Sequence, residues 1–144
     1  MQMFLLVSII KKLLPEDAYL FDKITDEVNN FQPAAILCDF IKDPADSSPK
    51  VYAITENDDI LSYAVMDSSH IFYNNRIISE PIIYTVERFR NKKIAQILLS
   101  NIIFENYRNH YITYGCDYNN TPSNLLAQKT GLKFLGTNYH YMGN

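Results

Sequence analysis

The fold of this chain is decided by the stretch IIYTVERFRNKKIA, residues 82–95. A strand ends in this stretch, a basic turn follows, and a helix begins. The first backbone amides of a helix have no intrahelical acceptor, and they lie at the positive end of the helix dipole. Beside them are the basic side chains of Arg88, Arg90, Lys92 and Lys93. The stretch therefore predicts either a site that binds a phosphate or an ordinary solvated basic turn.

Downstream, the most regular pattern predicts a helix over Ile94–Tyr107. Its apolar residues recur at helical spacings and form one stripe, which includes Ile94, Ile97, Leu98 and Ile102. Beyond this helix we expect a strand over Tyr111–Cys116, a second helix over Pro122–Lys129 and an extended segment over Leu132–Met142. Gly131 is placed to end the second helix.

Upstream, the sequence predicts a strand, two helices and then antiparallel strands. Met3–Ile10 is apolar without a 3.6-residue period, which favours a strand. Pro15 and the acidic residues after it suit a first helical turn, so we expect a helix over Glu16–Asn29. The polar turn 56–59 predicts a hairpin between the strands on either side of it. The other expected segments are a helix at Ala34–Ile41, a mobile loop at Lys42–Lys50, and strands at Val51–Thr55, Ile60–Met66, His70–Tyr73 and Arg76–Val86.

This order of elements predicts one α/β (α+β) domain over residues 1–144, with a mixed, mostly antiparallel sheet flanked by helices. A chain of 144 residues has the usual size of a single domain. Its 47% hydrophobic residues are enough to fill a core, which excludes a wholly disordered polypeptide.

Charge and hydropathy exclude two classes of partner. Thirteen Lys and Arg against sixteen Asp and Glu give a net charge of −3 without a long run of one sign, so we expect no nucleic-acid partner. The apolar run within Met1–Leu14 is shorter than the roughly 20 residues that span a bilayer. It also lacks the leading positive charge of a secretory signal. We interpret it as a strand, with a membrane-touching end as the alternative.

Cysteine and histidine spacing gives no sign of a metal. Cys38 and Cys116 lack the paired spacing of a zinc site, which favours a reduced, cytoplasmic protein and leaves a disulfide open. His70, His110 and His140 have no ligand spacing on one helix face. We expect His110 to cap the negative end of the long helix.

The basic turn resembles a known cofactor loop. Residues 90–95, RNKKIA, are similar to the acyl-CoA pyrophosphate loop of the GNAT (general control non-repressible-related) N-acetyltransferase superfamily, whose pattern is Gln or Arg, two residues, Gly, one residue, then Gly or Ala. Arg90 and Ala95 match this pattern. Lys93 replaces the central glycine of the pattern. A glycine has no Cβ, so a phosphate can approach its backbone closely. If the Lys93 side chain points to solvent, the backbone still accepts the pyrophosphate; if its Cβ faces the loop interior, the pyrophosphate is displaced.

Another block supports the resemblance. Residues 120–132, NTPSNLLAQKTGL, resemble the family's Asn, two residues, Ala or Ser, then a short helix that ends in Lys-x-Gly-Phe. Only the last aromatic residue is changed, to Leu132. The two blocks extend the resemblance over roughly residues 51–142. Residues 116–120, CDYNN, together with residues 126–129, LAQK, are most similar to a bacterial branch of the family.

The resemblance implies that acetyl-CoA is the cosubstrate and that an amine accepts its acetyl group. In the family, the strand before the loop pairs with the pantetheine arm, a role that falls here to Tyr84, Thr85 and Val86. The loop amides hold the pyrophosphate, which implies a cofactor-binding set of Arg90, Asn91, Lys92, Lys93, Ile94 and Ala95. Asn120 and Ser123 are implied to bind the cofactor arm.

Direct attack of a neutral amine on the thioester needs a proton acceptor and an acid for the leaving thiolate. Some family members carry a glutamate on the strand before the loop, which implies Glu80 as the acceptor, with Glu87 as a rival. The tyrosine that many members use as the acid is replaced by Ala127. The candidate acids near the preceding strand are Tyr118, which we take as the catalytic residue, and its alternatives Tyr114 and Cys116.

Three functions follow from these residues. The first is an N-acetyltransferase that acts in the cytoplasm on a primary amine of a small molecule or peptide; the net charge of −3 suits a cationic amine. The second is a non-catalytic acyl-CoA-binding or regulatory module, indicated by Lys93 and Ala127. The third is a structural α/β interaction domain that binds no CoA. A homodimer through Leu132–Met142 is open, because that segment is apolar and rich in tyrosine.

Overall fold

The computed structural model describes residues 8–136, except for the side chains of residues 69–73. Five strands in this part of the chain form one sheet in the order β1-β2-β3-β4-β5. The elements are, in chain order, β1 (Ile9–Lys12), η1 (Pro15–Ile24), α1 (Thr25–Asn29), α2 (Ala34–Lys42), β2 (Lys50–Glu56), β3 (Asp59–Tyr73), β4 (Arg76–Thr85), η2 (Glu87–Phe89), α3 (Ile94–Asn106), β5 (His110–Ile112) and α4 (Thr121–Lys129), where η marks a 3-10 helix.

The sheet is mixed and mostly antiparallel. β1 to β4 pair antiparallel, and β5 pairs with β4 in parallel. Two tight turns make the long hairpins, one at Asn57 and Asp58 and one at Asn74 and Asn75, and all four residues have a positive φ. Asn and Asp tolerate that conformation better than most residues with a Cβ. The predicted fold class is confirmed.

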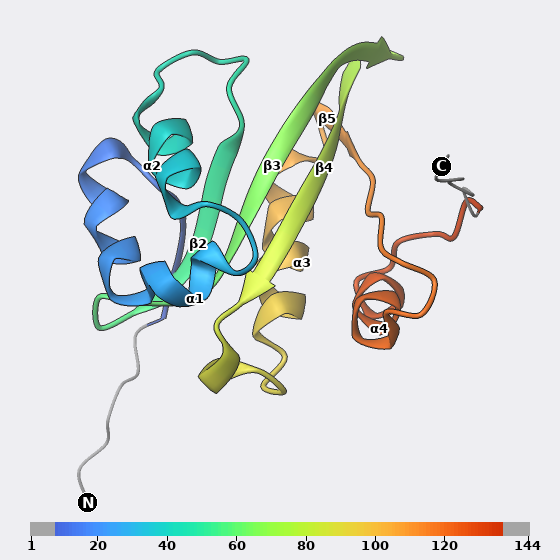
Figure 1. The fold of residues 1–144 in the computed structure, drawn as a ribbon. Helices are drawn as coiled ribbons and strands as arrows, with labels where there is room; N and C mark the ends of the chain where they lie inside the picture. The colour runs from blue at the N-terminus through green and yellow to red at the C-terminus, as the bar shows by residue number, and fades with distance from the viewer. Residues whose placement is uncertain (1–7, 137–144) are drawn as a thin grey trace, which may run out of the picture.

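Helices cover both faces of the sheet (Figure 1). η1, α1 and α2 lie on one face, where Phe21 and Leu37 pack in one buried cluster with Tyr63 of β3. α3 lies on the other face, where Leu98 and Ile102 pack in a second cluster. α4 lies to one side of the sheet, beyond β5, and contacts α3 (Figure 1). The arrangement leaves the β4 side of the sheet for the site described below.

The helix expected over Glu16–Asn29 forms as two segments, η1 and α1. Ile24 separates them with φ −123° and ψ 14°, away from helical values. Asp17 fixes the start of η1, because its carboxylate accepts from Leu14 N at 2.8 Å and from Lys11 Nζ at 2.8 Å. Burial alone would raise the pKa of Asp17, but these two hydrogen bonds outweigh it and hold that pKa below its ordinary value.

The strand predictions differ from the structure in the middle of the sheet. The expected strands Ile60–Met66 and His70–Tyr73 are parts of the single strand β3, whose pairing with β4 shifts register between Ser68 and Phe72. The strand expected at Tyr111–Cys116 is only the three residues of β5. The chain leaves the sheet after that point.

The two ends were less well predicted. The first strand was expected over Met3–Ile10, but β1 begins at Ile9, and residues 3–7 lie outside the described part. The extended segment expected at Leu132–Met142 contains no strand over residues 132–136, and its remainder also lies outside the described residues.

α3 does not present a single apolar stripe. Leu98, Leu99 and Ile102 are buried, whereas Ile97 is 51% exposed and Phe104 is 72% exposed. The placement of Ile97 in the buried stripe was therefore wrong. Apolar residues occupy both sides of the helix, so their spacing does not select the buried face. No helix between residues 8 and 136 is long and apolar enough to cross a membrane.

Candidate active site

The sheet opens between β4 and β5. Their last backbone hydrogen bond runs from Thr113 N to Ser79 O at 2.9 Å. Beyond it the chain runs away from β4 toward α4 (Figure 1). The rest of β4, residues 80–85, therefore has a neighbouring strand on one side only. We call this opening the fork.

Side chains lock the base of the fork. Ser79 is 1% exposed, and its Oγ lies 2.6 Å from Nδ1 of His110 and 2.9 Å from Oγ of Ser68. Burial lowers the pKa of His110, so its ring is neutral at pH 7. His110 begins β5 and binds Ser79, and it does not end the long helix as expected. These contacts fix where β4 and β5 separate.

Odd-numbered residues of β4 turn their backbone toward the fork. Ser79 accepts from the β5 side, whereas Val86 N–H donates to a carbonyl of β3 at 3.0 Å. Successive residues of a strand point their backbone groups in opposite directions. Pro81, Ile83 and Thr85 therefore face the fork, and the even-numbered residues face β3.

This geometry changes the set of residues expected to bind the cofactor arm. Of Tyr84, Thr85 and Val86, Thr85 alone has its backbone on the fork edge, and its carbonyl accepts from Arg90 Nε at 3.0 Å. Pro81 has no N–H. Ile83, which was not among the predicted residues, is thus the residue of this edge whose N–H and carbonyl are both available to a ligand.

The turn that follows β4 is open to solvent. Arg90, Asn91, Lys92 and Lys93 are exposed, and Ile94 and Ala95 are partly buried. Asn91 and Lys93 have φ values of 64° and 61°, in the left-handed region. Lys93 is the N-cap of α3 and makes no side-chain cap, so the first amides of that helix have no intrahelical partner. The lysine thus adopts the backbone conformation that glycine adopts most easily.

The Tyr84 side chain points away from the fork, toward the face covered by α1 and α2. Its hydroxyl donates to Oε2 of Glu27 at 2.6 Å. Burial and the Glu27 carboxylate raise the pKa of Tyr84 to about 12. The Arg90 guanidinium lies 5.4 Å from the centroid of the Tyr84 ring. Tyr84 and Arg90 therefore connect the turn to the helices.

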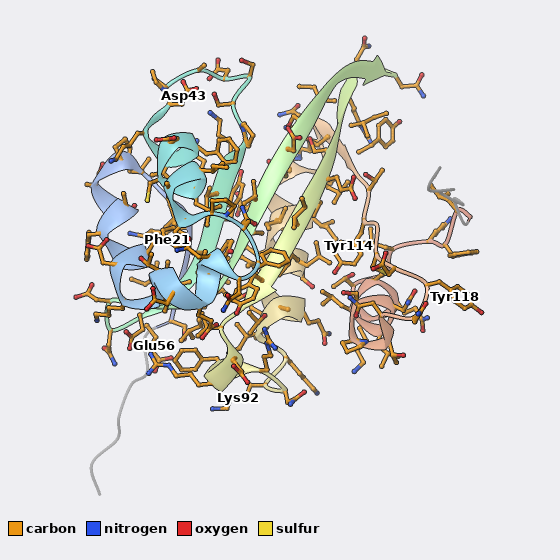
Figure 2. The ribbon with its side chains drawn as sticks, in the orientation of Figure 1. Phe21, Asp43, Glu56, Lys92, Tyr114 and Tyr118 are labelled. Atoms are coloured by element: carbon orange, nitrogen blue, oxygen red, sulfur yellow. The ribbon has the colours of Figure 1, made fainter. Side chains whose placement is uncertain are left out.

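The second sequence block forms the start of α4. Asn120 is its N-cap, with the side-chain oxygen accepting from Ser123 N at 3.2 Å. Ser123 Oγ in turn accepts from the hydroxyl of Tyr114 at 3.3 Å. Tyr114 is half-buried in the space between β4 and α4 (Figure 2), and burial raises its pKa.

Glu80 lies where the fork begins. It lines a cavity of about 220 Å³ with Asp67, Ser68, Ile78, Ile82 and Thr113. Asp67 and Glu80 are opposite each other in the β3–β4 ladder. A Cβ on Gly115 would lie 2.9 Å from Oε1 of Glu80, so the glycine leaves room for this carboxylate. Like charges in opposite positions destabilise a sheet, which favours a functional reason for the pair.

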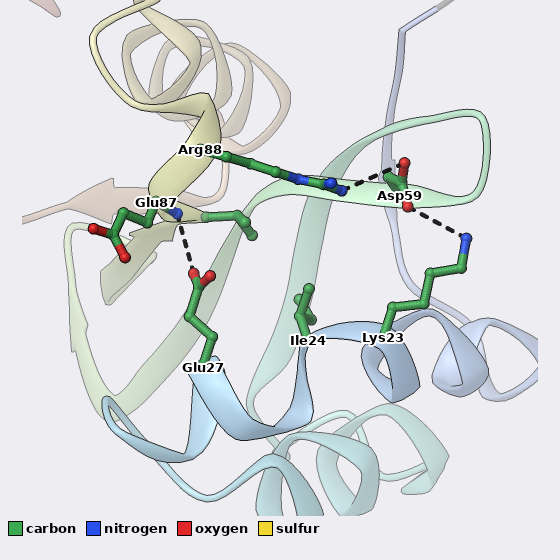
Figure 3. Close-up of a pocket in the computed structure, with 7 residues that line it drawn as sticks. Lys23, Ile24, Glu27, Asp59, Glu87 and Arg88 are labelled. Carbon is green, nitrogen blue, oxygen red and sulfur yellow. Dashed lines mark hydrogen bonds and ion pairs between the residues drawn. The ribbon is translucent and has the colours of Figure 1, made fainter.

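The other candidate catalytic residues lie away from this cavity. Tyr118 is 86% exposed, on the outer side of the loop before α4 (Figure 2), and this leaves its phenol unfixed. Glu87 is exposed and lines a larger cavity of about 670 Å³, shown in Figure 3, with residues that include Lys23 and Arg88. Cys116 is an exposed, free thiol. Glu80 therefore lines the cavity at the start of the fork, Tyr114 lies between β4 and α4, and Tyr118 lies outside both.

Three residues of the site were not predicted: Asp67, Ile83 and Gly115. One signal for the open edge was present in the sequence, because proline is confined to strand edges and Pro81 lies in the middle of a long strand. No local signal marks Gly115 or Asp67, since both meet Glu80 only through the fold. Among the described residues no group of three or more His, Cys, Asp or Glu side chains is placed to hold a metal ion.

No protein-family model and no curated protein matches this sequence. Solved structures do match its fold. The aminoglycoside N-acetyltransferase AAC(6')-Iy in complex with CoA superposes with a TM-score of 0.75 at 12% identity, over 99% of both chains. The ribosomal-protein-alanine N-acetyltransferase from Brucella melitensis biovar Abortus 2308 gives 0.68 at 13% identity, over 95% of this chain and 100% of the other.

A third match is the aminoglycoside acetyltransferase meta-AAC0020 from an uncultured soil metagenomic sample, in complex with sisomicin. Its TM-score is 0.70 at 10% identity, over 95% of this chain and 97% of the other. This chain shares the fold of these three solved structures. The fold that the sequence resemblance implied is therefore confirmed.

Proposed function

We propose that this protein is an N-acetyltransferase that moves an acetyl group from acetyl-CoA to an amine. The observation that carries the proposal is the fork, an open strand edge that leads directly into a turn with free helix amides. An extended polar arm pairs with such an edge, and a diphosphate binds at such a helix start. The fold shared with a CoA-bound N-acetyltransferase supports this assignment.

In this proposal the pantetheine arm lies along β4 and pairs with the backbone of Ile83 and Thr85. The diphosphate meets the turn residues Arg90, Asn91, Lys92, Lys93, Ile94 and Ala95. Asn120 and Ser123 lie across the fork, at the start of α4, where they contact the arm. Ile83 replaces Tyr84 and Val86 in the predicted set, because those two turn their backbone toward β3.

The reaction is direct attack of the neutral amine on the thioester carbon. The C–N bond forms, the nitrogen loses a proton to Glu80, and the C–S bond then breaks. We assign the thioester oxygen to the Ile83 amide, the first N–H on the fork edge after Pro81, because a fixed donor stabilises the developing negative charge. The thiolate takes a proton from Tyr114, which replaces Tyr118 in the role of acid.

The two carboxylates of the cavity suggest an amine that carries positive charge. Glu80 accepts the proton, and Asp67 beside it would attract a second cationic group of the same molecule. Ile78 and Ile82, two residues from Glu80 on either side along β4, add apolar surface to the same cavity. The matched enzyme that binds sisomicin supports a polyamine of this kind. The substrate class is therefore a small molecule or peptide with more than one amine.

A thermal-shift titration with acetyl-CoA and CoA tests the proposal, with ATP as an anion control. A ligand at a hundred times its Kd stabilises the folded state by about 2.7 kcal/mol. We expect a larger rise in Tm with both CoA species than with ATP at the same concentration, followed by turnover on a panel of polyamines. Glu80→Gln should then lower kcat by about a hundredfold, the usual lower range for loss of a general base.

Charge reversal at two arginines locates the binding site. Arg90→Glu should weaken CoA binding at least about tenfold, a difference of roughly 1.4 kcal/mol. Arg88→Glu should have little effect, because Arg88 is directed to Asp59 at 3.6 Å in the larger cavity (Figure 3). Equal effects would count against the assignment of the turn.

The alternative is a module that binds acyl-CoA without catalysis. Ala127 at the tyrosine place favours it, because the α4 helix then supplies no phenol to the fork. CoA stabilisation without turnover on any amine would support this function. Absence of a CoA effect would favour an interaction domain.

Two further proposals concern the setting of the protein. Cys38 and Cys116 are both free thiols, which supports the reducing conditions of the cytoplasm. Phe134 and Leu135 are 84% and 90% exposed, which supports a homodimer through the C-terminal segment. Gel filtration coupled to light scattering distinguishes a dimer from a monomer.

A further inference from the structure

One carboxylate oxygen joins α1 to the end of β4. Oε2 of Glu27 accepts from the hydroxyl of Tyr84 at 2.6 Å and from the backbone N of Glu87 at 3.1 Å. Figure 3 shows the second of these bonds, between the helix and the turn η2. Hydrogen bonds to an ionised carboxylate are stronger than those between neutral groups. Glu27 thus holds both sides of the point where the strand ends.

The turn has few other anchors, and the polar one among them is the exposed ion pair between Arg88 and Asp59 of β3 at 3.6 Å. Glu87 and Arg88 are exposed, and Phe89 is the one residue of η2 that packs against the core clusters. The larger cavity opens beside η2, between Glu27 and Arg88 (Figure 3). Apolar packing alone therefore leaves this segment weakly fixed, and the Glu27 carboxylate is the polar contact that ties it to a helix.

From Tyr84 the contacts continue into the turn that we assign to CoA. The Tyr84 ring lies 5.1 Å from the ring of Phe31 and 5.6 Å from that of Tyr63, measured between centroids. Its other neighbour is the Arg90 guanidinium, whose Nε donates to the carbonyl of Thr85 on the fork edge. A side chain of α1 is thereby linked through two contacts to the first residue of the basic turn.

We propose that Glu27 is a positioning residue that holds the basic turn in the shape that binds CoA. It touches neither the acetyl group nor the amine. The choice of CoA as the ligand of this turn rests on the proposed function. The hydrogen bonds of Glu27 to Tyr84 and Glu87 do not depend on it. A loop that is already ordered binds more tightly, because less conformational freedom is lost on binding.

The test compares Glu27→Ala, Glu27→Gln and the control Asp26→Asn, which changes an exposed carboxylate of the same helix. The first readout is amide hydrogen exchange of residues 87–95 without ligand, and the second is the Kd of CoA by calorimetry. Coupling between sites in proteins is commonly about 5- to 150-fold. We expect Glu27→Ala to weaken CoA binding about tenfold and to speed exchange in the turn. Glu27→Gln should do less, because its amide oxygen still accepts both bonds.

With turnover, Glu27→Ala should raise the KM for acetyl-CoA and leave kcat at saturation unchanged, a split that a general loss of stability would not produce. If Glu27→Ala fails to fold, Tyr84→Phe removes one of the two bonds and keeps the ring. The positioning role would be overturned if the folded variants bound CoA with the same affinity as wild type and showed the same amide exchange in the turn. Faster exchange in variants of a protein that does not bind CoA would instead overturn the proposed function, and Glu27 would then order the turn without serving CoA.

Discussion

Lys93 holds a backbone conformation that is costly for a residue with a Cβ. Its φ is 61°, and a non-glycine residue in this region costs about 1 to 3 kcal/mol. Glycine removes that cost but gives up some chain entropy, so we expect Lys93→Gly to raise the free energy of unfolding by about 1 kcal/mol. Urea denaturation followed by circular dichroism measures the change.

Lys92→Gly is the matched control, because Lys92 has no positive φ in the structure. There glycine brings only its entropic cost, of about 0.5 to 1 kcal/mol, and should destabilise the protein. If both variants changed the free energy of unfolding in the same direction, the left-handed conformation assigned to Lys93 would be contradicted. If Lys93→Gly also leaves CoA affinity unchanged, the lysine side chain was pointing to solvent and was never an obstacle to the pyrophosphate.

Tyr114 and Tyr118 are close in sequence and differ in burial. Burial raises the pKa of Tyr114, so its phenol stays protonated at neutral pH and can give a proton to the thiolate. Tyr114→Phe should lower kcat by about a hundredfold, whereas Tyr118→Phe should change it less than about twofold. In wild type, the loss of rate at alkaline pH should begin only when the pH reaches the raised pKa of Tyr114. A larger loss for Tyr118→Phe would restore the sequence-based prediction.

At the scale of elements, a buried carboxylate joins β1 to η1. The pKa of Asp17 is depressed in the folded protein, so its stabilising effect is present above the unfolded value of 3.8 and is lost as the pH falls through the lower folded value. Asp17→Asn should cost about 1 to 3 kcal/mol at pH 7, as expected for a hydrogen-bonded charge. Wild type and variant should converge in urea titrations once the pH falls below the depressed pKa of Asp17.

The exposed neighbour Glu16 supplies the control, because Glu16→Gln removes a nearby carboxylate and keeps both hydrogen bonds of Asp17. A constant difference between wild type and Asp17→Asn at every pH would instead show that shape, and not charge, makes the contact. The test therefore separates the ion pair with Lys11 from packing at the start of η1.

Elements with a local cause were predicted, and elements set by distant contacts were not. The helix start at Ile94 and the hairpin turns follow from nearby residues. The single strand β3 was divided because its polar residues 67–70 interrupt the apolar pattern. β5 was predicted too long because the composition of Tyr111–Cys116 favours an extended conformation along its whole length. Only pairing with Ser79, far away in sequence, determines that the strand ends after Ile112.

At the scale of the whole molecule, the same limit explains what was found of the site. The basic turn and Glu80 lie in one continuous stretch, so the sequence placed them together. Gly115 reaches Glu80 because β5 pairs with β4 and the chain leaves the sheet beside Glu80. Tyr114 reaches Ser123 because the chain then turns back into α4. No periodicity carries that information, which is why Tyr118 was favoured over Tyr114 as the acid.

The fork as a whole predicts a footprint for CoA in hydrogen exchange. A bound arm and diphosphate should slow exchange at Ile83 and at amides 93–96, two segments that lack backbone partners in the free protein. The hairpin turn at Asn74 and Asn75 lies at the opposite end of β4 and should not respond. ATP shares the diphosphate but lacks the pantetheine arm, so at high concentration it should slow exchange at 93–96 without affecting Ile83. Protection by CoA at the helix start without protection at Ile83 would mean that the fork edge stays empty, and the turn would then be an anion site that has lost its connection to acetyl transfer.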